Sequence, residues 1–108
     1  MNARNLTWSK TEKSVARQAF DSAYRRECAT VAQRINAMSR DIANPTDMWR
    51  LHDFLSEKRQ EIDTKYDYRY SVLIFVFARL MQEGWLHASD LDGLHAEKVS
   101  MIQALANM

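Results

Sequence analysis

The sequence predicts an all-α fold, and three observations support that prediction. Only two of the 108 residues are Gly and one is Pro, while 46% are apolar and 27% are charged, a composition that favours long helices over a turn-rich β architecture. No Gly or Pro occurs before Pro45. The most apolar segment, residues 71–81, has no second strand candidate with which to pair. The length fits a single domain, residues 1–108.

The first helix should begin at Lys10. Ser9 and Glu12 have the S-x-x-E spacing of a capping box, in which each side chain accepts from the backbone N–H of the other residue. With no turn residue before the Pro, we expect the helix to continue to about Ala43, over roughly 50 Å at 1.5 Å per residue. The alternative, a helix that breaks and folds back near residues 28–30, lacks a turn residue to mark the break.

Apolar side chains along this helix form a seam with the alternating four-and-three spacing of a heptad. The seam consists of Tyr24, Cys28, Val31, Ile35, Met38 and Ile42. A helix of this length exceeds the width of a compact domain of 108 residues, and the rest of the chain offers too little to cover it. We therefore expect a homodimer. Its interface should contain Tyr24, Val31, Ile35, Met38 and Ile42.

A second helix should start after Asn44, a suitable N-cap, with Pro45 at the first helical position, and end near Asp67. At 100° per residue it has an apolar stripe, expected in the core, and a polar face. The stripe consists of Met48, Leu51, Leu55, Ile62 and Tyr66. The polar face consists of Trp49, His52, Asp53, Ser56, Arg59, Gln60 and Asp63. A Trp among charges either is half covered in the dimer seam or contacts a partner protein, and the sequence leaves both interpretations open.

The remaining chain should form a small helical head. Residues 71–81 are expected to be a helix that ends near Gly84 and, because it is apolar all round, lies at the centre of the head. Ser89 to Asp92 resembles an N-cap for a final amphipathic helix, whose first turn Gly93 could break. That helix would carry Leu91, Leu94, Met101, Ile102 and Leu105. The organisation is thus a stem over residues 1–66 and a head over residues 67–108.

Charge and composition argue against several function classes. The formal net charge of +1 gives no large field for nucleic acid, and the longest apolar run is far short of the roughly 18 residues that suggest a membrane span. No metal-ligand or nucleophile motif occurs, so we expect no metal, no cofactor and no enzyme activity. A lone Cys28 and an N-terminus without an apolar signal segment are simplest in the cytoplasm. Glu57, Glu61 and Lys65, spaced by four, are expected on a solvated face.

Two blocks of sequence are far more specific than composition or periodicity. They are WRLHDFLSEKRQEIDTKYDYR, residues 49–69, and SVLIFVFARLMQEG, residues 71–84. Together with Trp8-Ser9, Glu12 and the pairs Ala23-Tyr24 and Arg26-Glu27, they closely resemble the fluorescence recovery protein family of cyanobacteria. The resemblance covers nearly the whole chain.

The resemblance implies a non-enzymatic, all-helical protein that dimerises through its long helices and carries smaller helical heads. It implies that the partner is the photoactivated orange carotenoid protein, which family members help to detach from the phycobilisome antenna and return to its resting orange form. For a cyanobacterial source it implies action at the thylakoid surface. The family has relatives in bacteria without phycobilisomes, so the alternative is a dimeric helical interaction or signalling module with a different partner.

The resemblance also implies which residues contact the partner. They are Trp49, His52, Asp53 and Arg59 on one helix, and Phe75 in the head together with basic residues of the last helix. Here the last helix has Lys98, but Met101 and Gln103 where Lys can occur. Because Arg59 lies about 120° around the helix from Asp53, we expect Arg59 to support the dimer seam and the other three to touch the partner.

Overall fold

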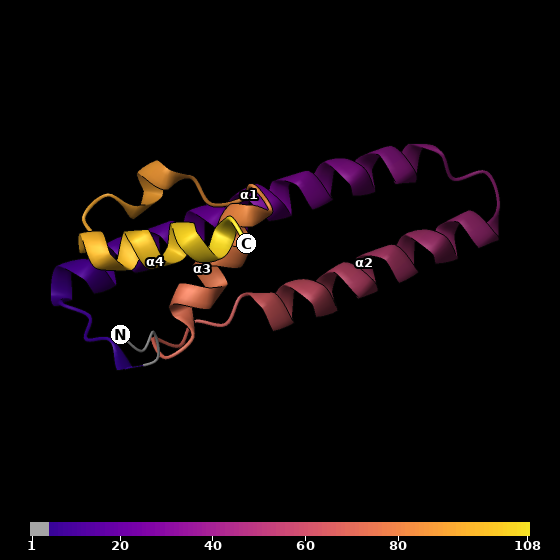
Figure 1. Cartoon of the computed structure of the whole chain (residues 1–108). Coiled ribbons are helices and arrows are strands. Elements are labelled where there is room, and N and C mark those ends of the chain that lie inside the picture. The colour runs from indigo at the N-terminus through magenta and orange to yellow at the C-terminus, as the bar shows by residue number, and fades with distance from the viewer. Residues whose placement is uncertain (1–4) are drawn as a thin grey trace.

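The computed structural model describes residues 5–108 and is helical throughout its main elements. These are α1 (Lys10–Arg40), α2 (Pro45–Lys65), α3 (Leu73–Gln82), the 3₁₀ helix η2 (Ala88–Leu91) and α4 (Ala96–Ala106). The molecule is elongated, with extents of 55 × 26 × 22 Å. Figure 1 shows α1 and α2 as a long hairpin that projects from a head in which α3 and α4 lie beside the start of α1. The all-α prediction is confirmed.

Local sequence signals set the start of both stem helices. The Glu12 amide donates to Ser9 Oγ, and the Ser9 amide donates to Glu12 Oε1, each over 3.1 Å, which is the predicted capping box. At the start of α2 the Asp47 amide donates to Asn44 Oδ1 over 3.1 Å, and Pro45 follows the N-cap, where its missing N–H costs nothing.

The stem helices end close to the predicted positions. α1 is continuous for 31 residues, so the alternative break near residues 28–30 is excluded, although the helix ends at Arg40 rather than near Ala43. α2 ends at Lys65, and its C-cap is Tyr66. The chain then runs without regular structure to the turn that precedes α3. The stem helices therefore run without a break, and the chain changes direction at the tip of the stem and at the head.

The core of the head is built around α3, as its apolar character predicts. Buried α3 side chains are Leu73, Ile74, Val76, Phe77, Ala78 and Leu80. They belong to one cluster with Trp8 and with the α1 residues Ala16, Ala19, Phe20 and Ala23. The head is therefore not made of residues 67–108 alone, because the first half of α1 is part of its core.

Gly84 ends α3 as predicted. The Gly84 amide donates to the Met81 carbonyl over 3.1 Å, and the Trp85 amide donates to the Leu80 carbonyl over 2.9 Å, the two hydrogen bonds of a Schellman motif. Gly84 has φ of 89°, a left-handed conformation that favours Gly over residues with a Cβ.

The predicted N-cap of the last helix is wrong. Ser89 lies within η2 and Asp92 is its C-cap, whereas α4 begins at Ala96 and is capped by His95, whose Nδ1 accepts from the Glu97 amide over 3.3 Å. Between them Gly93 has φ of 104°, and a Cβ there would lie 2.8 Å from Cγ2 of Val15 in α1. Gly93 is itself a local signal against a helix at this point, and its left-handed conformation and close approach to α1 fit a helix that begins only at Ala96. Leu91 and Leu94 are buried as expected, but they precede the helix.

Candidate functional site

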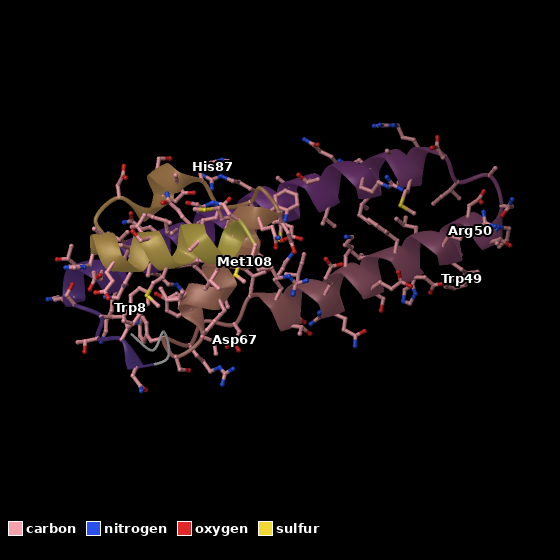
Figure 2. The ribbon with its side chains drawn as sticks, viewed as in Figure 1. Trp8, Trp49, Arg50, Asp67, His87 and Met108 are labelled. Atoms are coloured by element: carbon pink, nitrogen blue, oxygen red, sulfur yellow. The ribbon has the colours of Figure 1, made fainter. Side chains whose placement is uncertain are left out.

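Three of the predicted contact residues lie together on α2, and we call them the Trp49 face: Trp49, His52 and Asp53. Trp49 is 58% exposed, and its indole meets the His52 imidazole nearly edge-on, with ring centroids 6.4 Å apart. His52 Nδ1 lies 3.4 Å from Asp53 Oδ1. Figure 2 shows Trp49 near the tip of the stem, far from the head. A large aromatic anchor beside polar groups is the usual composition of an interface hot spot.

Arg59 lies apart from the Trp49 face. It is six residues after Asp53, which places it roughly 9 Å further along the helix axis. Its Nε lies 3.7 Å from Asp63 Oδ2, in the ion pair that the spacing of four indicates. Arg59 also lines a groove of about 490 Å³ between α1 and α2. The other lining residues are Tyr24, Cys28, Val31, Leu55, Lys58, Ile62 and Asp63, so Arg59 shares the groove with three residues of the predicted seam.

One edge of the stem exposes large apolar side chains, and we call it the apolar edge: Tyr24, Ile42, Met48 and Leu55. Their exposed fractions lie between 39% for Ile42 and 48% for Leu55. Three other seam residues, Val31, Ile35 and Met38, are half-buried. The predicted core stripe of α2 is therefore not covered within one chain, since Ile62 is its only buried member among the described residues. The apolar edge adjoins the groove that contains Arg59.

Phe75 is exposed on α3 and does not join the Trp49 face. It is 43% exposed although its neighbours Ile74 and Val76 are buried. The structure therefore presents the predicted contact residues as two separate surfaces, one on the stem and one on the head.

Lys98 is not available as a basic contact on the head. It is only 6% exposed, and its Nζ lies 2.9 Å from Glu12 Oε2 and donates to the Thr7 carbonyl over 2.7 Å. Burial alone would raise the pKa of Glu12, but hydrogen bonds from the His95 amide, Lys98 and the Ser9 amide outweigh burial and lower that pKa to about 2. Lys98 therefore joins α4 to the start of α1, and the resemblance overstated its exposure.

Lys65 does not lie on a solvated face, which corrects the prediction. Its side chain has no exposed area, and its Nζ lies 2.7 Å from Glu27 Oε2 and 2.7 Å from Glu83 Oε1. Tyr66 Oη donates to the other Glu27 oxygen over 2.9 Å. Burial would lower the pKa of Lys65, but hydrogen bonds to Glu27 and Glu83 outweigh it and raise that pKa. This network, the junction network, joins α1, α2 and α3 where the stem meets the head.

The sequence did hold a signal for the burial of Lys65. Lys65 follows Ile62 by three residues, which places the two about 60° apart on the helix, on the side that faces α1. Its partners Glu27 and Glu83 lie 38 and 18 residues away, so no local pattern could identify them. Arg26 likewise has a partner distant in the sequence: its Nη1 lies 2.6 Å from Asp90 Oδ2. This ion pair joins η2 to α1.

Within residues 5–108 no group of three or more His, Cys, Asp or Glu side chains is arranged to hold a metal ion. None of the helices in that range is long and apolar enough to cross a membrane.

Comparisons with known proteins agree with the resemblance. The sequence profile of the family described as photoprotection regulator fluorescence recovery protein matches residues 8–106. The fluorescence recovery protein of Synechocystis sp. (strain ATCC 27184 / PCC 6803 / Kazusa) is 48% identical over 101 residues, which cover 94% of this chain and 93% of that protein.

Solved structures agree as well. The structure of the fluorescence recovery protein of Fremyella diplosiphon matches with a TM-score of 0.88 and 49% identity, over 94% of this chain and all of that one. The Synechocystis sp. PCC 6803 structure matches with a TM-score of 0.88 and 47% identity over the same shares. The stem and head described above are thus similar to an arrangement that has been solved in relatives.

Proposed function

Because the chain belongs to the fluorescence recovery protein family, we propose that it is a non-enzymatic regulator of the photoactivated orange carotenoid protein. In this proposal it binds that protein, promotes its detachment from the phycobilisome and accelerates its return to the resting orange form. The partner is the one that the resemblance implies, and the proposed compartment is the cytoplasm, at the thylakoid surface.

The observation that supports the proposal most is the exposure of the Trp49 face. An indole that is 58% exposed keeps apolar area in contact with water, which is unfavourable unless a partner covers it. His52 and Asp53 stand beside it and can supply the polar rim. Phe75 adds a second exposed aromatic ring on the head.

We propose that the active form is a homodimer joined through the apolar edge. Tyr24 and Leu55 are each more than 40% exposed, and the adjoining groove between α1 and α2 can take side chains of a second copy. Arg59, at the border of this groove, would then support the dimer rather than touch the carotenoid protein directly. Arg is well suited to such a seam because its planar guanidinium makes several hydrogen bonds at once.

The test is a spectral recovery assay. Illuminated orange carotenoid protein is placed in the dark with and without micromolar dimer, and the return of the orange absorption is followed. The proposal expects faster recovery and a complex on size exclusion chromatography. Unchanged recovery with no complex would reject it.

That outcome would favour the second candidate, a dimeric helical interaction module with a different partner. One observation supports this candidate: Lys98 is buried against Glu12, so the head lacks the basic contact that the resemblance implies there.

A further inference from the structure

A second groove lies on the other side of the contact between α1 and α2, where the stem meets the head. Its volume is about 290 Å³. It is lined by Glu27, Thr30, Val31, Arg34, Phe54, Lys58 and Trp85, and we call it the Phe54 groove. Val31 and Lys58 line both grooves, so they lie between the two. Phe54 lies about 100° around the helix from Leu55 of the apolar edge, so the Phe54 groove lies on a different side of α2 from that edge.

The Phe54 groove combines apolar surface with two cations. The Arg34 guanidinium carbon lies 5.7 Å from the centre of the Phe54 ring, and Lys58 Nζ lies 6.0 Å from it, both within cation–π range. Trp85, in the loop after α3, completes the lining, and its indole N–H donates to Glu83 Oε1 over 3.2 Å. The groove thus offers an aromatic surface with positive charge beside it.

The carboxylates near this groove only partly neutralise it. Glu27 is held by Lys65 and Tyr66 in the junction network and adds no free charge. Glu61 lies 3.4 Å from Lys58, but that pair is exposed to solvent, where an ion pair is worth little. Arg34 is exposed and has the Phe54 ring as its described contact. Glu83, which accepts from the Trp85 indole, is paired with Lys65 and Arg79. The charge that Arg34 and Lys58 offer to a ligand is therefore positive.

We propose that the Phe54 groove docks a short acidic segment of a partner protein, with one apolar side chain against Phe54 and carboxylates at Arg34 and Lys58. Its volume of about 290 Å³ is at the lower end of the range of roughly 300–1,000 Å³ typical of cofactor and small-molecule sites, which suits one anchoring side chain. Two cations are too few for a nucleic acid, whose binding depends on many phosphate contacts. The inference rests on the proposed function, in which a partner protein is the ligand.

The experiment uses the full-length chain labelled with ¹⁵N and a blocked five-residue peptide, a central Phe with two Glu on each side. The three Trp indole N–H signals serve as reporters. The acidic peptide should shift the Trp85 signal in a saturable way and leave the signals of Trp49 and the buried Trp8 in place. Peptides with Gln or Lys in place of Glu should bind at least about tenfold more weakly, because charged hydrogen bonds carry much of the affinity.

Two variants separate the groove from general charge. Arg34→Gln should weaken binding of the acidic peptide by about fivefold or more, and Arg34→Glu further. Arg40→Glu is the matched control for charge reversal, since Arg40 is an exposed Arg on the same helix about 120° around it from Arg34. It should bind the peptide like the native chain.

The inference is overturned if the acidic peptide leaves the Trp85 signal unchanged, if it shifts Trp49 instead, or if Arg40→Glu weakens binding as much as Arg34→Glu. Its failure can be told from that of the proposed function, because the recovery assay uses no peptide. Native recovery with no peptide binding rejects the groove alone. Peptide binding by a chain without recovery activity rejects the carotenoid protein as partner and keeps the groove.

Discussion

The substitution Lys65→Met would remove the centre of the junction network while keeping the length of the side chain. The Lys65 side chain has no exposed area and that of Glu27 is 4% exposed, so the change leaves a buried carboxylate without its ammonium. Removing one partner of a buried pair costs about 3–5 kcal/mol. Part of this is offset because Glu83 is 30% exposed and keeps its ion pair with Arg79. We therefore expect a loss of about 3 kcal/mol of unfolding free energy, or about 10–15 °C in Tm.

The assay is urea denaturation followed by far-ultraviolet circular dichroism at a fixed protein concentration. Lys58→Met is the matched control, because Lys58 is on the same helix and its ion pair with Glu61 is 3.4 Å long but exposed. It should cost less than about 0.5 kcal/mol. The double variant Lys65→Met with Glu27→Gln should regain part of the loss, since it removes the unpaired charge. If Lys65→Met costs no more than Lys58→Met, the junction network does not hold the stem to the head.

Three further predictions concern the dimer and the ion pair between Lys98 of α4 and Glu12 of α1. Ile35→Glu should shift the mass from dimer toward monomer in light scattering, because an unpaired charge in the half-buried seam costs several kcal/mol; a native chain that is monomeric at tens of micromolar would refute the seam. Arg59→Leu should lower dimer mass or stability in the same measurement, since Arg59 lines the groove beside the apolar edge; an unchanged dimer that no longer binds its partner would reverse its proposed role. Glu12 has a folded pKa of about 2, below its ordinary value of 4.5, so the stability it adds is present above about pH 4.5 and is lost as the pH falls toward 2. Denaturation of the native chain and of Glu12→Gln should show a difference in unfolding free energy of order 3 kcal/mol or less at pH 7. This difference should decrease as the pH falls, and a difference that does not change with pH would contradict the proposed role of the Glu12–Lys98 ion pair.

Signals that act over three or four residues predicted the fold well. Ser9 with Glu12, and Asn44 with Pro45, fixed both helix starts because capping is a local hydrogen-bond pattern. Gly84 marked the end of α3 for the same reason. The rotation of about 100° per residue also predicted that Arg59 lies on a different side of α2 from Asp53. In the structure Arg59 lines the groove between α1 and α2, apart from Trp49 and His52.

What the sequence could not predict depends on partners distant in the chain. Lys98 looks like an ordinary surface charge, and for Lys65 only its position near Ile62 on the helix indicates burial. Their partners, Glu12 and Glu27, lie across the fold, 86 and 38 residues away. The start of α4 was misplaced although Gly93 signalled a break, because only the fold shows that the turn at Gly93 lies close to Val15 and that the helix begins after it. The Phe54 groove was missed because it joins two stem helices to Trp85 of the head, and each part looks unremarkable alone.

The most direct test of the account is the dark recovery of illuminated orange carotenoid protein with the native chain and with Asp53→Leu. Asp53 is 73% exposed in its side chain and its described contact is His52, so the substitution should leave helicity and dimer mass intact. We expect the native chain to accelerate recovery, and Asp53→Leu, with the same fold and mass, to lose most of the acceleration. Recovery unaffected by the native chain, or fully retained by Asp53→Leu, would contradict this expectation.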